Sequence, residues 1–296
     1  MIGHIWKTMR PNHWIKNAFV FAPLFFSGGA TEAMKLGRVF LVFLSFSAIA
    51  SAVYFFNDLI DRERDRSHPQ KCMRPIASGA LPIKIGIFFG LGLAMFSLAL
   101  AFSIDLMLVL LLFLYSAINV MYSLWLKHIV IVDVFVISMT FVLRVLSGGV
   151  AINVELTSWL LITTFLLALF LALAKRRHEL VILQDSTNNQ RPVLNQYTPQ
   201  LVDELMSLIT PVILVTYILY TLSAETLARF NSKTLYSTSI FVVFGIMRYL
   251  YLIHRKNLGG APTEIVIHDL PLLIAILGWI LSFYLIIYTP VLKILS

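Results

Sequence analysis

The chain has 296 residues, of which 59% are hydrophobic and only 13% are charged, and its mean hydropathy is +0.85. Such a composition excludes a soluble globular domain and is typical of a polytopic helical membrane protein. The net charge of +8 must then lie in the loops, where it bears on topology and on anionic ligands rather than on nucleic-acid binding. The single cysteine, Cys72, excludes a disulfide framework.

Nine apolar segments are predicted to cross the membrane as α-helices, within a single domain of residues 1–296. The first segment is short, contains Pro23 and follows a basic stretch without a signal-peptide cleavage site. A count of eight remains the alternative, if this segment lies in the membrane interface. The predicted segments are 14–27, 38–58, 82–102, 105–125, 129–152, 157–174, 201–223, 235–254 and 270–288.

Lysine and arginine are unevenly divided between the two sides of these segments. One side carries the basic N-terminal stretch and two long charged loops, about 59–81 and 175–200. The other side carries Lys35, Arg38, Arg229, Lys233 and Lys293. Because positively charged loops remain in the cytoplasm, we expect a cytoplasmic N-terminus in a multi-pass plasma (inner) membrane protein. Both long loops would then be accessible to substrates from the cytosol. The sequence does not indicate the oligomeric state.

The most charged stretch of the chain, NDLIDRERDRSHPQKCMRPIASG, follows the second segment. On a helix Asn57, Asp61 and Asp65 are four residues apart and Asp58 lies three before Asp61, so we expect all four on one face. Their carboxylates repel one another unless a cation bridges them, and hard oxygen ligands suit Mg²⁺, which shares its shell with substrate phosphates. We predict a Mg²⁺ site here, with Asp58 and Asp61 required for catalysis. The alternative is a solvated loop of mixed charge.

Cations and a tyrosine near this stretch are candidates for binding anions. Lys71 and Arg74 follow the acidic residues and could cap the oxygens of a metal-bound diphosphate, or else act as positively charged membrane anchors. Tyr122 and Lys127 lie near a cytoplasmic helix end, where they could also meet an anion.

Two charged residues fall inside the fifth predicted segment. Asp133 and Arg144 are costly at membrane depth and need partners, but eleven residues place them about three helical turns apart, too far to pair. We expect Arg144 to face the protein interior. A structural ion pair with another helix is the alternative to a functional role.

The stretch KRRHE, residues 175–179, ends the sixth predicted segment. Its position matches that of the acidic stretch in a faint internal repeat, in which RPIASGALP (74–82) corresponds to RPVLNQYTP (191–199). We expect Lys175 and Arg176 to bind a second anionic group, with Glu179 on the face of Lys175; a membrane anchor is the alternative.

Arg248 is a weaker candidate for binding substrate, and its side chain could instead extend its charge to the membrane interface. The histidines show no zinc-ligand spacing, and no phosphate-binding loop or nucleophile elbow is found.

NDxxDxxxD at the end of a second helix, followed by RPIASG, resembles the UbiA-type superfamily of intramembrane prenyltransferases over most of the chain. The resemblance implies nine transmembrane helices around a central cavity, and Mg²⁺ as cofactor. Usual members carry a second aspartate-rich motif after the sixth helix and bind a prenyl diphosphate between the two motifs. This chain has KRRHE at that place.

Six stretches in order resemble one branch of that superfamily, the decaprenyl-phosphate phosphoribosyltransferases: RPNHWIKN, NDLIDRERDRSHPQK, YSLWLK with VDV, FVLRVLSGG, AKRRHE, and FGIMRYLYL with GGAP. This branch moves phosphoribosyl from 5-phosphoribosyl diphosphate (PRPP) to a polyprenyl phosphate. The resemblance implies that Asn57, Asp58 and Asp61 hold Mg²⁺ and the donor diphosphate. Candidate ligands for the phosphates are Lys16, Lys71, Arg74, Tyr122, Lys127, Lys175 and Arg176.

This donor has a diphosphate at one end and a phosphate at the other, which suits one metal site and one basic cluster. The acceptor phosphate is already anionic, so no strong base is required, and its attack opposite the leaving group predicts inversion at C1. Two rivals remain: a prenyltransferase acting on an aromatic or other acceptor, and a transporter without catalysis. A transporter would hold polar groups near the midplane of several spans, whereas the charges here gather at one face.

Overall fold

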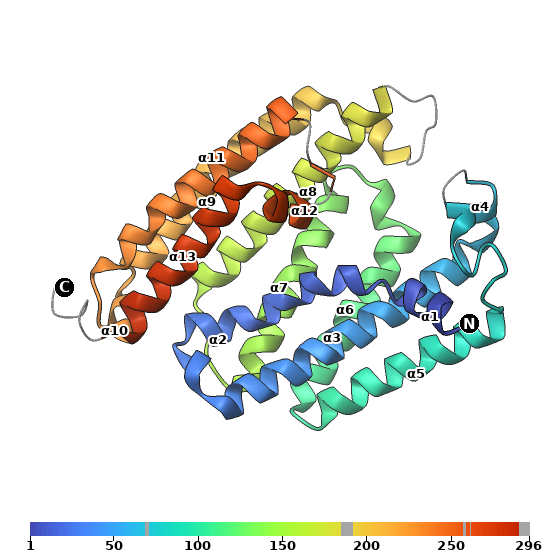
Figure 1. Ribbon diagram of the computed structural model, residues 1–296, viewed down its shortest axis with the longest axis horizontal. Helices are drawn as coiled ribbons and strands as arrows, with labels where there is room; N and C mark the ends of the chain where they lie inside the picture. The colour runs from blue at the N-terminus through green and yellow to red at the C-terminus, as the bar shows by residue number, and fades with distance from the viewer. Residues whose placement is uncertain (69–70, 185–191, 257–258, 261, 290–296) are drawn as a thin grey trace. The chain divides into compact units, whose positions relative to one another are not determined.

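The computed structural model describes residues 1–68, 71–184, 192–256, 259–260 and 262–289, and every regular element in these ranges is a helix (Figure 1). Within these ranges, eight helices are long and apolar enough to cross a membrane, which confirms the predicted helical membrane fold. They are α3 (Ala33–Ile60), α5 (Ile83–Phe102), α6 (Leu106–Leu124), α7 (Val132–Ile152), α8 (Ser158–Gln184), α9 (Pro199–Leu222), α11 (Ser239–Lys256) with η6 (Thr234–Thr238) before it, and α13 (Leu270–Tyr288).

The first predicted segment differs from these eight helices. It begins with η1 (Pro11–Phe21), a 3-10 helix of 11 residues, and continues into α2 (Ala22–Phe26). Such 3-10 runs seldom exceed four residues, because their hydrogen bonds are poorly aligned. A ninth span and a cytoplasmic N-terminus therefore stay predictions. The remaining described short helices are α1 (Ile2–Met9), η2 (Gly29–Thr31), α4 (Arg62–Arg66), η3 (Lys71–Met73), η4 (Leu126–His128), η5 (Pro192–Gln196), α10 (Ala224–Phe230) and α12 (Pro262–His268).

The chain forms two compact units, each with its own packing, and the single-domain organisation stays a prediction. The first unit comprises 1–125 and 140–156, and the second 126–139 and 157–296. In the first unit α3 packs along α5 and also contacts α6 and η1. In the second, α8 packs along α9, and α11 along α13.

Two helix ends position the charged motifs. The α3 helix ends at Ile60, but backbone hydrogen bonds from Asp61 to Asn57 and from Asp65 to Asp61 continue its path into α4. The α8 helix runs to Gln184, so the first part of the predicted loop 175–200 is helical, and the KRRHE stretch lies within α8. Arg191, at the start of the second repeat element, and Lys293 lie outside the described residues.

Candidate functional site

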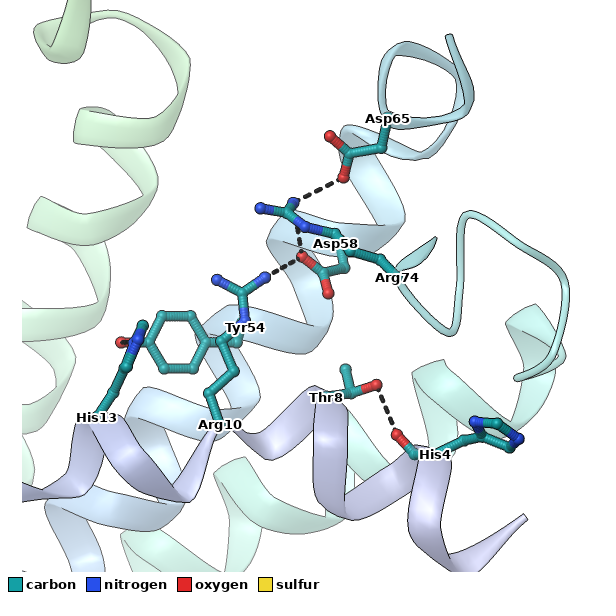
Figure 2. Close-up of polar contacts among 8 residues, drawn as sticks. All are labelled: His4, Thr8, Arg10, His13, Tyr54, Asp58, Asp65 and Arg74. Carbon is teal, nitrogen blue, oxygen red and sulfur yellow. Dashed lines mark hydrogen bonds and ion pairs between the residues drawn. The ribbon is translucent and has the colours of Figure 1, made fainter. Parts of the chain in front are cut away.

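Two carboxylates of the acidic stretch form ion pairs with arginines (Figure 2). Arg10 and Arg74 both donate to Asp58 Oδ1, over 2.6 Å and 3.1 Å. The same Nη1 of Arg74 also donates to Asp65 Oδ2 over 2.6 Å. The Asp58 and Asp65 side chains are only 3% and 4% exposed, so guanidinium groups provide the positive charge that these buried carboxylates need.

Asn57 and Asp61 are placed differently from the two aspartates that pair with arginine. Both side chains are half-buried, lie one helical turn apart, and have no hydrogen-bond or ion-pair partner among the described residues. An amide oxygen and a carboxylate on one face fit Mg²⁺, which takes its other ligands from water and substrate phosphates. No group of three or more His, Cys, Asp or Glu side chains that could hold a metal ion occurs within the described ranges. Asn57 also lines a cavity of about 270 Å³ whose other lining residues, on α3, α5 and α6, are mainly apolar.

The N-terminal segment reaches this stretch through Arg10, which was not among the ligand-binding residues predicted from the sequence. Arg10 separates α1 from η1 with a left-handed backbone, at φ 53° and ψ 60°. Its guanidinium lies 4.7 Å from the centre of the Tyr54 ring, and the Tyr54 hydroxyl is 3.0 Å from His13 Nδ1. An arginine directly before Pro11 was the available signal, because a residue before proline is disfavoured in a helix and marks a break there.

The other candidates of the first unit lie on three elements. Lys16 is exposed on η1, whereas Lys71 on η3 and Tyr122 on α6 are half-buried. Lys127, on η4, belongs to the second unit and is half-buried.

In the second unit, Arg176 is the centre of a buried network. It donates to Asp133 Oδ2 over 2.7 Å and to Glu179 Oε2 over 2.5 Å. Tyr197 donates to Asp133 Oδ1 over 2.7 Å and accepts a hydrogen bond from the Ile131 backbone, also over 2.7 Å. Burial and the hydrogen bond to Asp133 raise the pKa of Tyr197, so this hydroxyl stays a donor. The structure thus gives Asp133 the partner that its burial requires, and brings Arg176 and Glu179 together; Lys175 is half-buried on the same helix.

Arg144 is buried in the first unit, as expected, but its hydrogen-bond acceptors are neutral. It donates to Asn17, to the Thr140 carbonyl and to Tyr115, over 2.8, 2.7 and 3.1 Å. Its guanidinium also lies 4.9 Å from the Tyr115 ring centre and 5.2 Å from that of Phe141. No carboxylate of the described residues pairs with it, so the alternative of an ion pair with another helix is not what the structure shows.

Arg248 forms an ion pair near the start of α13. It donates to both oxygens of Asp269, over 3.0 and 2.8 Å, and Asp269 Oδ1 also accepts from the Leu272 backbone. The bond from Arg248 is the main cause of the lowered pKa of Asp269. This two-bond pair gives Arg248 a structural role in joining α11 to α13.

Comparison with known proteins agrees with this architecture. Residues 18–264 match the UbiA prenyltransferase family. The chain is 31% identical to the decaprenyl-phosphate phosphoribosyltransferase of Mycolicibacterium smegmatis, over 95% of this chain and 91% of that protein. It is also 31% identical to the protein of that name from Mycobacterium tuberculosis, over 95% and 93% of the two chains. A UbiA homologue from Archaeoglobus fulgidus, solved with GPP and Mg²⁺, shares the fold with a TM-score of 0.71 at 18% identity, over 96% of this chain and 99% of that one.

Proposed function

Because the chain belongs to the UbiA prenyltransferase family, we propose that it transfers 5-phosphoribosyl from PRPP to a polyprenyl phosphate and releases diphosphate. The observation that supports this donor is the near full-length similarity to proteins named decaprenyl-phosphate phosphoribosyltransferase. The stretch KRRHE, where usual family members carry acidic residues, points in the same direction. The site is proposed to face the cytoplasm, since the positively charged loops favour that side.

Asn57 and Asp61 would hold Mg²⁺, and the cation would neutralise the diphosphate that leaves from C1. Arg74 and Lys71, which follow the acidic stretch on the same unit, would bind diphosphate oxygens that the metal does not reach. In the second unit, the basic residues near the end of α8 and Lys127 stay candidates for binding anionic groups. Arg176 is held by Asp133 and Glu179.

The reaction breaks the bond between C1 of the ribose and the diphosphate oxygen. An oxygen of the lipid phosphate forms the new bond to C1, and diphosphate leaves with the electron pair. The attacking phosphate is ionised at neutral pH, so the protein needs no strong general base. Attack from the face opposite the leaving group gives inversion at C1.

The second candidate function is transfer of a prenyl group from a prenyl diphosphate, because the solved Archaeoglobus fulgidus homologue that shares the fold was bound to GPP and Mg²⁺. Membranes containing the protein would be supplied with Mg²⁺, a polyprenyl phosphate and either PRPP labelled in the ribose or a labelled prenyl diphosphate. We expect label in the lipid fraction from PRPP alone, and none with Asp61→Asn. Incorporation from the prenyl diphosphate alone would refute the proposal.

A further inference from the structure

Asp58 lies on a different face of α3 from the Asn57–Asp61 pair. One residue along a helix is a rotation of about 100°, whereas residues four apart nearly coincide. Asp58 Oδ1 accepts from Arg10 and from Arg74, and the side chain is 3% exposed. A carboxylate oxygen has two lone pairs, so this oxygen is saturated by the two arginines. The contacts of Asp58 are therefore those of a residue that orients arginines.

Arg10 is held in place by the same helix. Its left-handed backbone, which residues other than glycine seldom adopt, turns the chain between α1 and η1. The guanidinium then lies against the Tyr54 ring and is bound by Asp58, and these two residues are four apart on α3. A sparsely populated backbone conformation persists where the surrounding contacts require it, and such residues cluster at functional sites.

Both arginines keep donors for a ligand. Their side chains are 25% and 28% exposed, whereas the Asp58 side chain between them is buried. A guanidinium has five N–H groups, and in the described residues only Nη2 of Arg10 and Nη1 of Arg74 donate to a carboxylate. Two partly exposed guanidinium groups aligned by one carboxylate suit the adjacent phosphoryl groups of a diphosphate (Figure 2).

We infer that Asp58 is a positioning residue that holds Arg10 and Arg74 as ligands for the donor diphosphate, while Asn57 and Asp61 are left to the metal. The N-terminal segment thereby contributes a ligand to the site of the acidic stretch. The inference rests on the proposed function for the presence of a diphosphate donor. It does not depend on which donor is used, because PRPP and a prenyl diphosphate share this group.

The test separates binding of diphosphate from binding of metal in the full-length protein in nanodiscs. Inorganic diphosphate is titrated at saturating Mg²⁺ by calorimetry, and Mg²⁺ is titrated at saturating diphosphate. We expect Asp58→Asn and Arg10→Gln to weaken diphosphate binding by about ten- to a hundredfold, the usual range for a lost charge-assisted hydrogen bond, with the Mg²⁺ midpoint within about twofold of the parent. Asp61→Asn should shift the Mg²⁺ midpoint. Arg38→Gln, an exposed arginine on the same helix, should change neither.

Arg10→Lys tests whether Arg10 binds diphosphate or only stabilises the fold. Lysine keeps the positive charge that pairs with Asp58 but lacks the planar, forked guanidinium group. We expect its thermal stability to stay near that of the parent while diphosphate binding falls. The inference is overturned if Asp58→Asn shifts the Mg²⁺ midpoint as much as Asp61→Asn does, or if both Arg10 variants bind diphosphate like the parent. Should Asp58→Asn not fold, the two Arg10 variants decide the question. If labelled PRPP gives no lipid product, these binding results remain interpretable and the donor assignment alone fails.

Discussion

Arg176 on α8 donates its Nε–H to Asp133 on α7 over 2.7 Å, and the two side chains are only 2% and 0% exposed. A buried carboxylate without a cation would be strongly destabilising, so this bond accounts for the buried Asp133 in the first turn of α7. Arg176 also donates to Glu179, so its guanidinium is bound on two sides. We regard it as the residue that fixes the basic end of α8, next to Lys175.

Loss of the Asp133 charge should destabilise the second unit. Asp133→Asn leaves Arg176 with one carboxylate, and breaking a buried pair from one side costs about 3–5 kcal/mol. Asp203→Asn is the matched control, since Asp203 pairs with Arg177 but is 34% exposed, and such pairs contribute about 1 kcal/mol or less. Thermal unfolding in detergent measures both. Equal shifts of the unfolding temperature would contradict the assigned importance of Asp133.

The metal site makes a separate prediction. Asp61→Asn should raise the Mg²⁺ concentration needed for half-maximal transfer by at least about tenfold, because it removes the charged ligand of the proposed pair. Glu63→Gln changes a carboxylate in the same stretch whose side chain is 74% exposed, and it should leave the Mg²⁺ dependence unaltered. Activity is measured across a Mg²⁺ titration after treatment with EDTA. An unchanged midpoint in Asp61→Asn would remove Asp61 from the metal site.

The eight long helices were predictable because a span of membrane length leaves an unmistakable apolar run. Tertiary pairing was not predictable in this way. Asp58 and Arg10 are 48 residues apart, and no spacing rule connects them. Helical geometry alone does place Asp58 about 100° from Asn57, whereas Asp61 lies nearly on the face of Asn57. Similarly, the sequence required a partner for Asp133 but could not indicate Arg176, which lies 43 residues later on another helix.

The 3-10 conformation of η1 could not be predicted from the sequence either, because the apolar run at 14–27 is equally compatible with an α-helix. The extension of α8 through KRRHE escaped prediction for another reason. Charged residues normally mark the end of a membrane span, yet they do not end the helix itself, and α8 runs through these residues to Gln184.

Close packing of η1 on α7 predicts a sharp difference between two glycines. A Cβ added to Gly148 would lie 2.0 Å from the Val20 carbonyl oxygen, so the two backbones would have to separate. Gly148→Ala should destabilise the protein by about 1–3 kcal/mol, as overpacking does. Gly92→Ala is the control, because its Cβ meets nothing within 4 Å and alanine favours the helix by about 0.5–1 kcal/mol. Thermal unfolding should give shifts of opposite sign, and similar shifts would argue against this contact.

The Arg248–Asp269 pair predicts how stability depends on pH. The hydrogen bond from Arg248 is the first cause of the lowered pKa of Asp269, which means that the folded state favours the ionised carboxylate. This stabilisation is complete above the carboxyl pKa of the unfolded chain, 3.8, and is lost as pH falls through the lower pKa of the folded state. Asp269→Asn should therefore lower the unfolding temperature at pH 7, and the difference from the parent should shrink below about pH 4. Glu264→Gln, an exposed carboxylate on α12, serves as control and should give no such trend. If the Asp269→Asn difference stays constant from pH 7 to pH 3, the ion pair does not contribute as the geometry indicates.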